Sequence, residues 1–181
     1  MEILSYILSI LGLISMVTAS LIKGENMKGI LILVFLGNML VATSYCFEAA
    51  WNGALSCFVG AAQTFLNYFF ESKNKKLPML MVGIYAGAFV VVNVAPYITN
   101  IVALFTSFGI VALIASLTFI MCIGQKSGTK YRIWSIINMV LWALYDLLSG
   151  AYAPLVTHAI MLASNIIGLL IHDVKNTKKT A

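Results

Sequence analysis

Long apolar runs separated by short polar segments dominate the amino-acid sequence. A helix that crosses a bilayer needs about 20 mainly apolar residues, because a rise of ~1.5 Å per residue must cover ~30 Å of hydrocarbon. Seven runs approach that length, and short polar segments or corners separate them. The predicted spans are Ile3 to Ile22, Gly29 to Phe47, Gly53 to Phe70, Leu77 to Ala95, Ile98 to Cys122, Ile133 to Leu148 and Pro154 to Ile171.

The positions of the prolines agree with helical spans. Pro78, Pro96 and Pro154 all fall at the ends of predicted spans, where a missing N–H does no harm. Alternating segments of ~10 residues, which are typical of membrane β-barrels, do not occur in the sequence. The first run is long, no basic residue precedes it, and the first charged residue of the sequence is Glu2, so we expect a span there and not a cleaved signal peptide.

Composition excludes most soluble classes of protein. Hydrophobic residues make up 61% of the 181 residues and charged residues only 9%, whereas soluble domains average ~45–50% apolar and ~25% charged residues. A soluble fold of this size could not hide so much apolar surface. A cytosolic enzyme, a nucleic-acid-binding module and a disordered chain are therefore excluded. We expect an all-α polytopic membrane protein with one transmembrane domain over residues 1–181 and the lipid bilayer as its main partner.

The basic residues predict the orientation in the membrane. All eleven Lys and Arg residues fall in segments 23–28, 73–76, 126–132 and 175–179, which follow the first, third, fifth and seventh spans. Basic residues close to spans stay on the cytoplasmic side. The sequence therefore predicts an outside N-terminus, an inside C-terminus and seven spans, since six would break the alternation. The same bias accounts for the net charge of +5 without a nucleic-acid partner.

Matching residues indicate an internal repeat of three helices. The recurring residues are Asn38 and Asn138, Tyr45 and Tyr145, and, at a slightly shorter offset, Asn67 and Asn165. The predicted arrangement is 3+1+3, with a first repeat over residues 1–76, a linker helix over 77–97 and a second repeat over 98–181. Parallel repeats of this kind occur in transporters, where the substrate site lies between them near the midplane.

Polar side chains within the spans gather on single helix faces. Because lipid cannot satisfy amide or imidazole groups, these faces should point into the bundle. One interpretation is a small polar cavity with aromatic walls that binds a solute. The alternative is interhelical hydrogen bonding that serves packing, at about 0.6 kcal/mol for each bond. The candidate substrate-binding residues are Asn38, Gln63, Asn67, Asn138, Trp142, Tyr145, His158 and Asn165.

Two ionisable residues lie on either side of the corner between the sixth and seventh spans. Asp146 precedes Gly150 by four residues and His158 follows it by eight, so an antiparallel corner can bring them together. Because histidine titrates near physiological pH, one hypothesis is a proton-coupling or substrate-sensing pair. The alternative is an interfacial acid and a hydrogen-bonded histidine in the core.

Signatures of enzymes and metal sites are missing from the sequence. It contains no HExxH and no GxSxG motif, and Cys46, Cys57 and Cys122 have no paired spacing. We expect the cysteines to be small packing residues. The sequence therefore predicts no enzyme, no catalytic residue, no cofactor and no metal.

The last two spans carry a recognisable motif. Trp142, Tyr145, Asp146 and Gly150 form W-x2-[YH]-[DN]-x3-G, and N-I-I follows at 165–167. With the segment G-A-A-Q-T at 60–64, where Gln63 replaces a basic residue, the chain resembles the YgjV family of bacterial inner-membrane proteins. The resemblance implies a multi-pass protein of the bacterial cytoplasmic membrane.

The resemblance also implies a likeness in architecture to the SWEET sugar transporters and the PnuC-type vitamin transporters. SWEET proteins use an asparagine in the last helix of each repeat at the substrate site, and Asn67 and Asn165 match those places. The hinge prolines of SWEET proteins and the W-x2-W motif of PnuC proteins are missing here, so the substrate stays open.

Two functions therefore remain. The first is a transporter or facilitator of a small neutral or weakly charged solute, such as a vitamin or a sugar, by alternating access. The second is a non-transporting accessory or assembly protein whose polar residues serve helix packing. Either could form a homo-oligomer.

Overall fold

A computed structural model describes residues 2–23, 25–47, 51–106, 109–149 and 152–174. Within these ranges the secondary structure is helical and contains no strand. The α-helices are α1 (Glu2–Leu21), α2 (Met27–Phe47), α3 (Trp51–Ser72), α4 (Met79–Val94), α5 (Ile101–Thr106), α6 (Gly109–Ile123), α7 (Gly128–Ser149) and α8 (Tyr152–Leu169). The 3-10 turn η1 (Ala95–Tyr97) extends α4, and the π-helical turn η2 (Leu170–Val174) extends α8.

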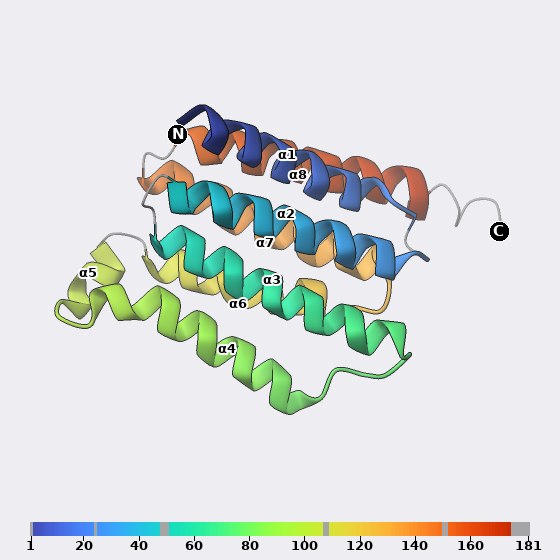
Figure 1. Ribbon diagram of the computed structural model, residues 1–181, viewed down its shortest axis with the longest axis horizontal. Coiled ribbons are helices and arrows are strands. Elements are labelled where there is room, and N and C mark those ends of the chain that lie inside the picture. Colours follow the sequence, from blue (N-terminus) through green and yellow to red (C-terminus); the bar gives the residue numbers. More distant parts are fainter. Residues whose placement is uncertain (1, 24, 48–50, 107–108, 150–151, 175–181) are drawn as a thin grey trace.

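The long helices are arranged in two layers (Figure 1). One layer contains α1, α2 and α3, which pack side by side in chain order, and the other contains α8, α7 and α6. Between the layers, α1 packs against α8 and α3 packs against α6, while α4 lies along the edge formed by α3 and α6. Consecutive long helices run in opposite directions, so the first residues of α1 and the last residues of α8 lie at opposite ends of the bundle.

Among the described residues, four segments are long and apolar enough to cross a membrane on their own: Ile3–Leu21, Met27–Phe47, Met79–Tyr97 and Pro154–His172. The helix α6 is a shorter apolar helix. The helices α3 and α7 have 22 residues each, and at ~1.5 Å per residue they reach the thickness of a bilayer. Their polar side chains lower their mean hydropathy, so the count of seven spans stays a prediction.

The predicted fifth span, Ile98 to Cys122, contains residues 107–108, which lie outside the described residues. Its described parts include α5 and α6. Next to this gap, a Cβ atom on Gly109 would meet Leu104 Cδ1 at 2.9 Å and the Leu104 carbonyl oxygen at 3.1 Å. The start of α6 thus approaches α5 so closely that a side chain does not fit there.

The beginning of α7 differs from the predicted element. The sixth span was expected from Ile133, but α7 begins at Gly128, so that Lys130 and Arg132 lie within the helix. Arg132 was counted among the basic residues between the fifth and sixth spans, whereas its side chain is fully buried in the structure. The first turns of α7 pack against α1, α2 and α6, and the length of an apolar run does not report such contacts.

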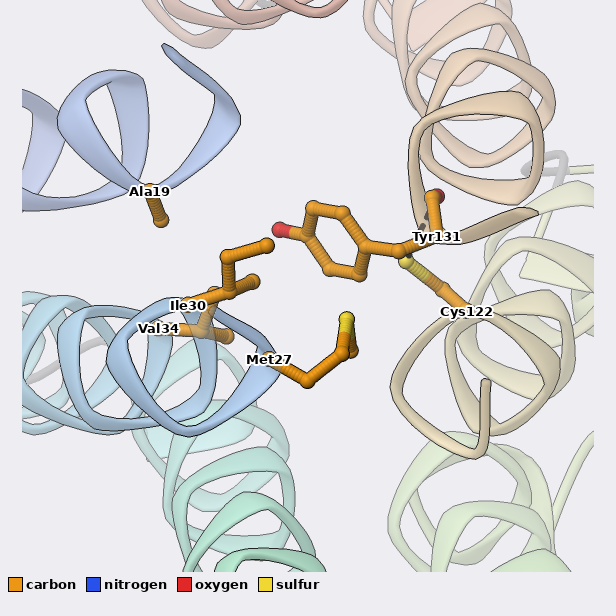
Figure 2. Packing of buried hydrophobic residues seen from close by; sticks show 6 residues of the cluster. All are labelled: Ala19, Met27, Ile30, Val34, Cys122 and Tyr131. Atoms are coloured by element: carbon orange, nitrogen blue, oxygen red, sulfur yellow. Dashed lines mark hydrogen bonds between the residues drawn. The ribbon is translucent and has the colours of Figure 1, made fainter. Parts of the chain in front are cut away.

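A cluster of apolar side chains fills the space between the layers (Figure 2). Tyr131 of α7 reaches across the space toward Ile30 and Val34 of α2, with Met27 beside its ring and Ala19 beyond its hydroxyl end. The outside of the bundle is also apolar, as shown by exposed fractions of 77% for Ile3 and 82% for Met79. A bundle with apolar side chains both inside and outside is suited to lipid as a solvent.

Candidate functional site

The polar residues that the sequence singles out occupy separate places in the bundle. The structure brings four of them together between α7 and α8, places two others on the face of α3 that packs against α6, and leaves the remaining three apart. The candidate site is therefore described as an outer aromatic cluster and an inner amide face.

The outer aromatic cluster consists of Trp142, Tyr145, Asp146 and His158. The Nδ1 atom of His158 lies 2.5 Å from Oδ2 of Asp146, within hydrogen-bonding distance. The indole of Trp142 stacks on the imidazole with a centroid separation of 5.7 Å and an angle of 17° between the planes. Tyr145 meets the same indole edge-on at 5.8 Å.

This geometry fixes the orientation of the imidazole, because Asp146 binds one edge of the ring and Trp142 covers one of its faces. The Asp146 side chain is 3% exposed and that of His158 is 20% exposed, so the carboxylate is shielded while one part of the ring remains accessible. One face of the Trp142 indole is in turn occupied by His158 and is not open to a solute.

The inner amide face lies on α3. Asn67 donates a hydrogen bond from Nδ2 to the Ile123 carbonyl oxygen of α6 at 3.0 Å. Its Oδ1 atom is buried and finds no partner within the described part of the chain. Gln63, one turn earlier on α3 and fully buried, has no hydrogen-bond partner there for either Oε1 or Nε2. These buried polar atoms require an explanation, because most such atoms in proteins are paired.

The asparagines of α7 and α2 donate hydrogen bonds to other protein groups. Asn138 of α7 donates from Nδ2 to the Ala115 carbonyl oxygen of α6 at 2.6 Å and to Thr118 Oγ1 at 2.9 Å. Asn38 of α2 donates to the Val34 carbonyl oxygen of its own helix at 2.9 Å. These bonds agree with a packing role for both residues.

The structure does not bring Asn67 and Asn165 together across one cavity, as the sequence had led us to expect. Asn165 bonds to the Met161 carbonyl oxygen of its own helix at 2.8 Å. The reason is the layer order, since α8 packs against α1 and α7, whereas α3 packs against α2, α4 and α6. Asn67 therefore meets the end of α6 and not its counterpart in the other repeat.

Two small cavities lie close to these residues. The first lies at the C-terminal end of α3 and is lined by Leu31, Asn67, Phe70, Glu71, Lys75, Leu77 and the segment 123–126. The second lies between the layers, where Asn138, Ser135 and Tyr131 of α7 face Val34 of α2. Each cavity has a volume of about 20 Å³, which is room for about one water molecule. A vitamin or a sugar fits neither cavity in this arrangement of the helices.

The sequence interpretation missed the contacts around the end of α1. Arg132 donates from Nε to the Ser20 carbonyl oxygen at 2.9 Å and from Nη2 to the Ile22 carbonyl oxygen. His172 of η2 donates from Nε2 to the Leu21 carbonyl oxygen at 2.7 Å. These side chains satisfy carbonyl groups that a helix leaves unpaired at its C-terminus, and a cation there also favours the helix dipole.

A buried tyrosine was also missed. Tyr85 of α4 is 4% exposed, and its hydroxyl group finds no partner among the described residues. It belongs to a buried cluster with Phe89 and Ile120, against which Val59 of α3 packs. A tyrosine in the middle of an apolar span is a signal that could have been found, because a phenolic hydroxyl in lipid is costly.

Helices of membrane-spanning length with an apolar outer surface define an integral membrane protein. A family model described as "Bacterial inner membrane protein", Imp-YgjV, matches residues 3–175. The chain therefore belongs to the Imp-YgjV family and is a protein of the bacterial inner membrane. No curated protein and no solved structure matches it.

Proposed function

We propose that this inner-membrane protein is a transporter or facilitator of a small neutral or weakly charged solute, such as a vitamin or a sugar. The observation that carries the proposal is the pair of buried side chains on α3, Gln63 and Asn67, whose amide groups include atoms without a partner among the described residues. An unpaired buried polar group costs about 1–3 kcal/mol. A solute with hydrogen-bonding groups would remove that cost while it is bound.

Transport by this route requires movement of the helices. The two cavities are too small for such a solute, so binding requires the layers to separate on one side at a time. The layer arrangement supports two repeats, because each layer holds three helices. In one layer α2 lies between α1 and α3, and in the other α7 lies between α8 and α6. Rocking of residues 1–76 against residues 98–181, with 77–97 as the linker, is the usual form of alternating access.

The proposed topology has seven crossings with the N-terminus outside and the C-terminus inside. The start of α1 and the end of α8 lie at opposite ends of the bundle, which supports an odd number of crossings. A C-terminal fusion to a fluorescent protein that folds only in the cytoplasm should fluoresce, and a C-terminal phosphatase should be inactive. An active phosphatase at the C-terminus would overturn this topology.

The test of transport is uptake into liposomes that contain the purified protein. Radiolabelled neutral sugars and vitamins are supplied outside, and uptake is compared with protein-free liposomes. A carrier should take up label faster when the same unlabelled solute is preloaded, because alternating access couples the two directions. Uptake equal to that of protein-free liposomes for the whole panel would refute the proposed class of solute.

The second candidate is an accessory or assembly protein that transports nothing. It is favoured by the hydrogen bond of Asn38 within α2 and by that of Asn138 to α6, since neither needs a solute. Under this alternative, purification under mild conditions should recover a stoichiometric membrane partner. Deletion of this protein should then impair the assembly of that partner, and the purified protein should give no flux in liposomes.

A further inference from the structure

The inner end of α3 carries a cavity with an ion pair at its exposed side. Lys126, in the segment after α6, forms a salt bridge with Glu71 of α3 and donates from Nζ to the Lys75 carbonyl oxygen at 2.8 Å. The side chains of Lys126 and Glu71 are 46% and 18% exposed. Asn67, which is 5% exposed, lines the same cavity one turn before Glu71. The cavity thus leads from exposed charges to a buried amide.

The polar face continues deeper into the bundle. Gln63 and Asn67 are four residues apart on α3, so their side chains lie on the same helix face. Gln63 offers Nε2 as a donor and Oε1 as an acceptor, and Asn67 offers Oδ1, all buried and without described partners. One turn further, Val59 packs against the cluster that holds Tyr85, whose hydroxyl is likewise unpartnered.

We propose that this face of α3 is the solute-binding site and that the Lys126–Glu71 ion pair closes its inner entrance. The proposal deepens the proposed transport function and rests on it. The site would be reached from the inner side by separation of the segment 123–126 from α3. It uses α3, α4 and α6, and it does not involve Asn165 of α8.

The chemistry of the face restricts the solute. Its charged groups are confined to the exposed side, at Glu71, Lys75 and Lys126, whereas the buried part offers two amides and a hydroxyl. A charged solute would lose its hydration there without a compensating charge. The face therefore fits a small neutral solute that carries both hydrogen-bond donors and acceptors, such as a polyol, a sugar or a neutral amide.

The binding test measures thermal stabilisation of the detergent-solubilised full chain by glycerol, glucose, urea and nicotinamide. At least one of these probes should raise the melting temperature of the wild type. The concentration needed should rise about tenfold or more in Gln63→Met and Asn67→Leu, because removing buried hydrogen-bonding groups from a polar site has a large effect. Asn165→Leu is the matched control and should respond as the wild type does.

The outcomes separate this site from the proposed function. If a probe stabilises wild type and Gln63→Met equally, or if only Asn165→Leu loses the response, the solute binds elsewhere and this proposal fails while transport stands. If none of the four probes stabilises the wild type, the assignment of a neutral solute to this face is overturned. The liposome assay then judges transport on its own.

The role of the ion pair is tested by chemical accessibility. Asn67→Cys is placed in a chain whose three native cysteines are replaced by alanine, and a small positively charged thiol reagent is supplied on the inner side. Adding Glu71→Gln should speed modification about two- to fivefold, the range that a partly exposed ion pair supports. Glu25→Gln, which removes an acid from another exposed loop, should leave the rate unchanged. Equal rates with and without Glu71→Gln would overturn the closing role.

Discussion

Replacing Gln63 by methionine should make the protein more stable, which is the reverse of the usual effect of a change in a core. Gln63 is fully buried, and neither its Oε1 nor its Nε2 atom has a partner among the described residues. Methionine has a similar length and volume, so packing should be nearly conserved. The change thus removes two unpaired polar groups without opening a cavity.

The size of the effect follows from those two groups. In soluble proteins an unpaired buried group costs about 1–3 kcal/mol, while hydrogen bonds inside membrane proteins are worth about 0.6 kcal/mol on average. Two groups at the lower figure give about 1 kcal/mol. We therefore expect Gln63→Met to raise the free energy of unfolding by about 1–2 kcal/mol.

The assay is equilibrium unfolding in mixed micelles with increasing denaturing detergent, followed by circular dichroism. Asn138→Leu serves as the matched control, because this amide is equally buried but donates to the Ala115 carbonyl oxygen and to Thr118. It should lower the free energy of unfolding by about 0.6–1.7 kcal/mol. If Gln63→Met lowers stability as much as Asn138→Leu does, Gln63 is a satisfied packing residue and the reasoning is refuted.

Two further changes test the packing of the bundle. Gly168→Ala should lower the melting temperature, because its Cβ atom would lie 2.3 Å from the Ser20 carbonyl oxygen; the cost in stability is about 1–3 kcal/mol. At Gly83 nothing lies within 4 Å of such a Cβ atom, so Gly83→Ala should leave the melting temperature unchanged or slightly raised. Trp142→Ala should lower the melting temperature while Trp142→Phe restores most of it, because a phenyl ring can still stack on His158; a loss of solute affinity at unchanged stability would instead show that the indole is a wall of the binding site.

Much of the helical framework could be predicted from apolar run lengths. The bounds of α2 and α4 differ by only a few residues from those expected, since lipid exposure makes hydropathy the main determinant of where such helices lie. The approach of Asp146 to His158 follows from the short corner between α7 and α8. Local sequence was sufficient where contacts are local or where lipid is the environment.

Contacts between layers could not be predicted in the same way. The separation of Asn67 from Asn165 depends on which helices become neighbours, and an alternating charge pattern does not specify this. The close approach of Gly109 to Leu104 depends on how α6 packs against α5. The burial of Arg132 depends on carbonyl groups more than a hundred residues earlier in the chain. The search for apolar runs of about 20 residues therefore placed this residue in the segment between two spans.

The contacts at the end of α1 have a consequence for biosynthesis. The carbonyl oxygens of Ser20 and Ile22 accept hydrogen bonds from Arg132, and that of Leu21 accepts one from His172, 151 residues later. While the chain is being translated, the first helix enters the membrane long before those side chains exist. Its end must therefore be hydrated or held by other groups until α7 supplies Arg132, and the Leu21 carbonyl oxygen until η2 supplies His172. A chain truncated before α8 would keep the contacts of Arg132 but would leave the Leu21 carbonyl oxygen without His172.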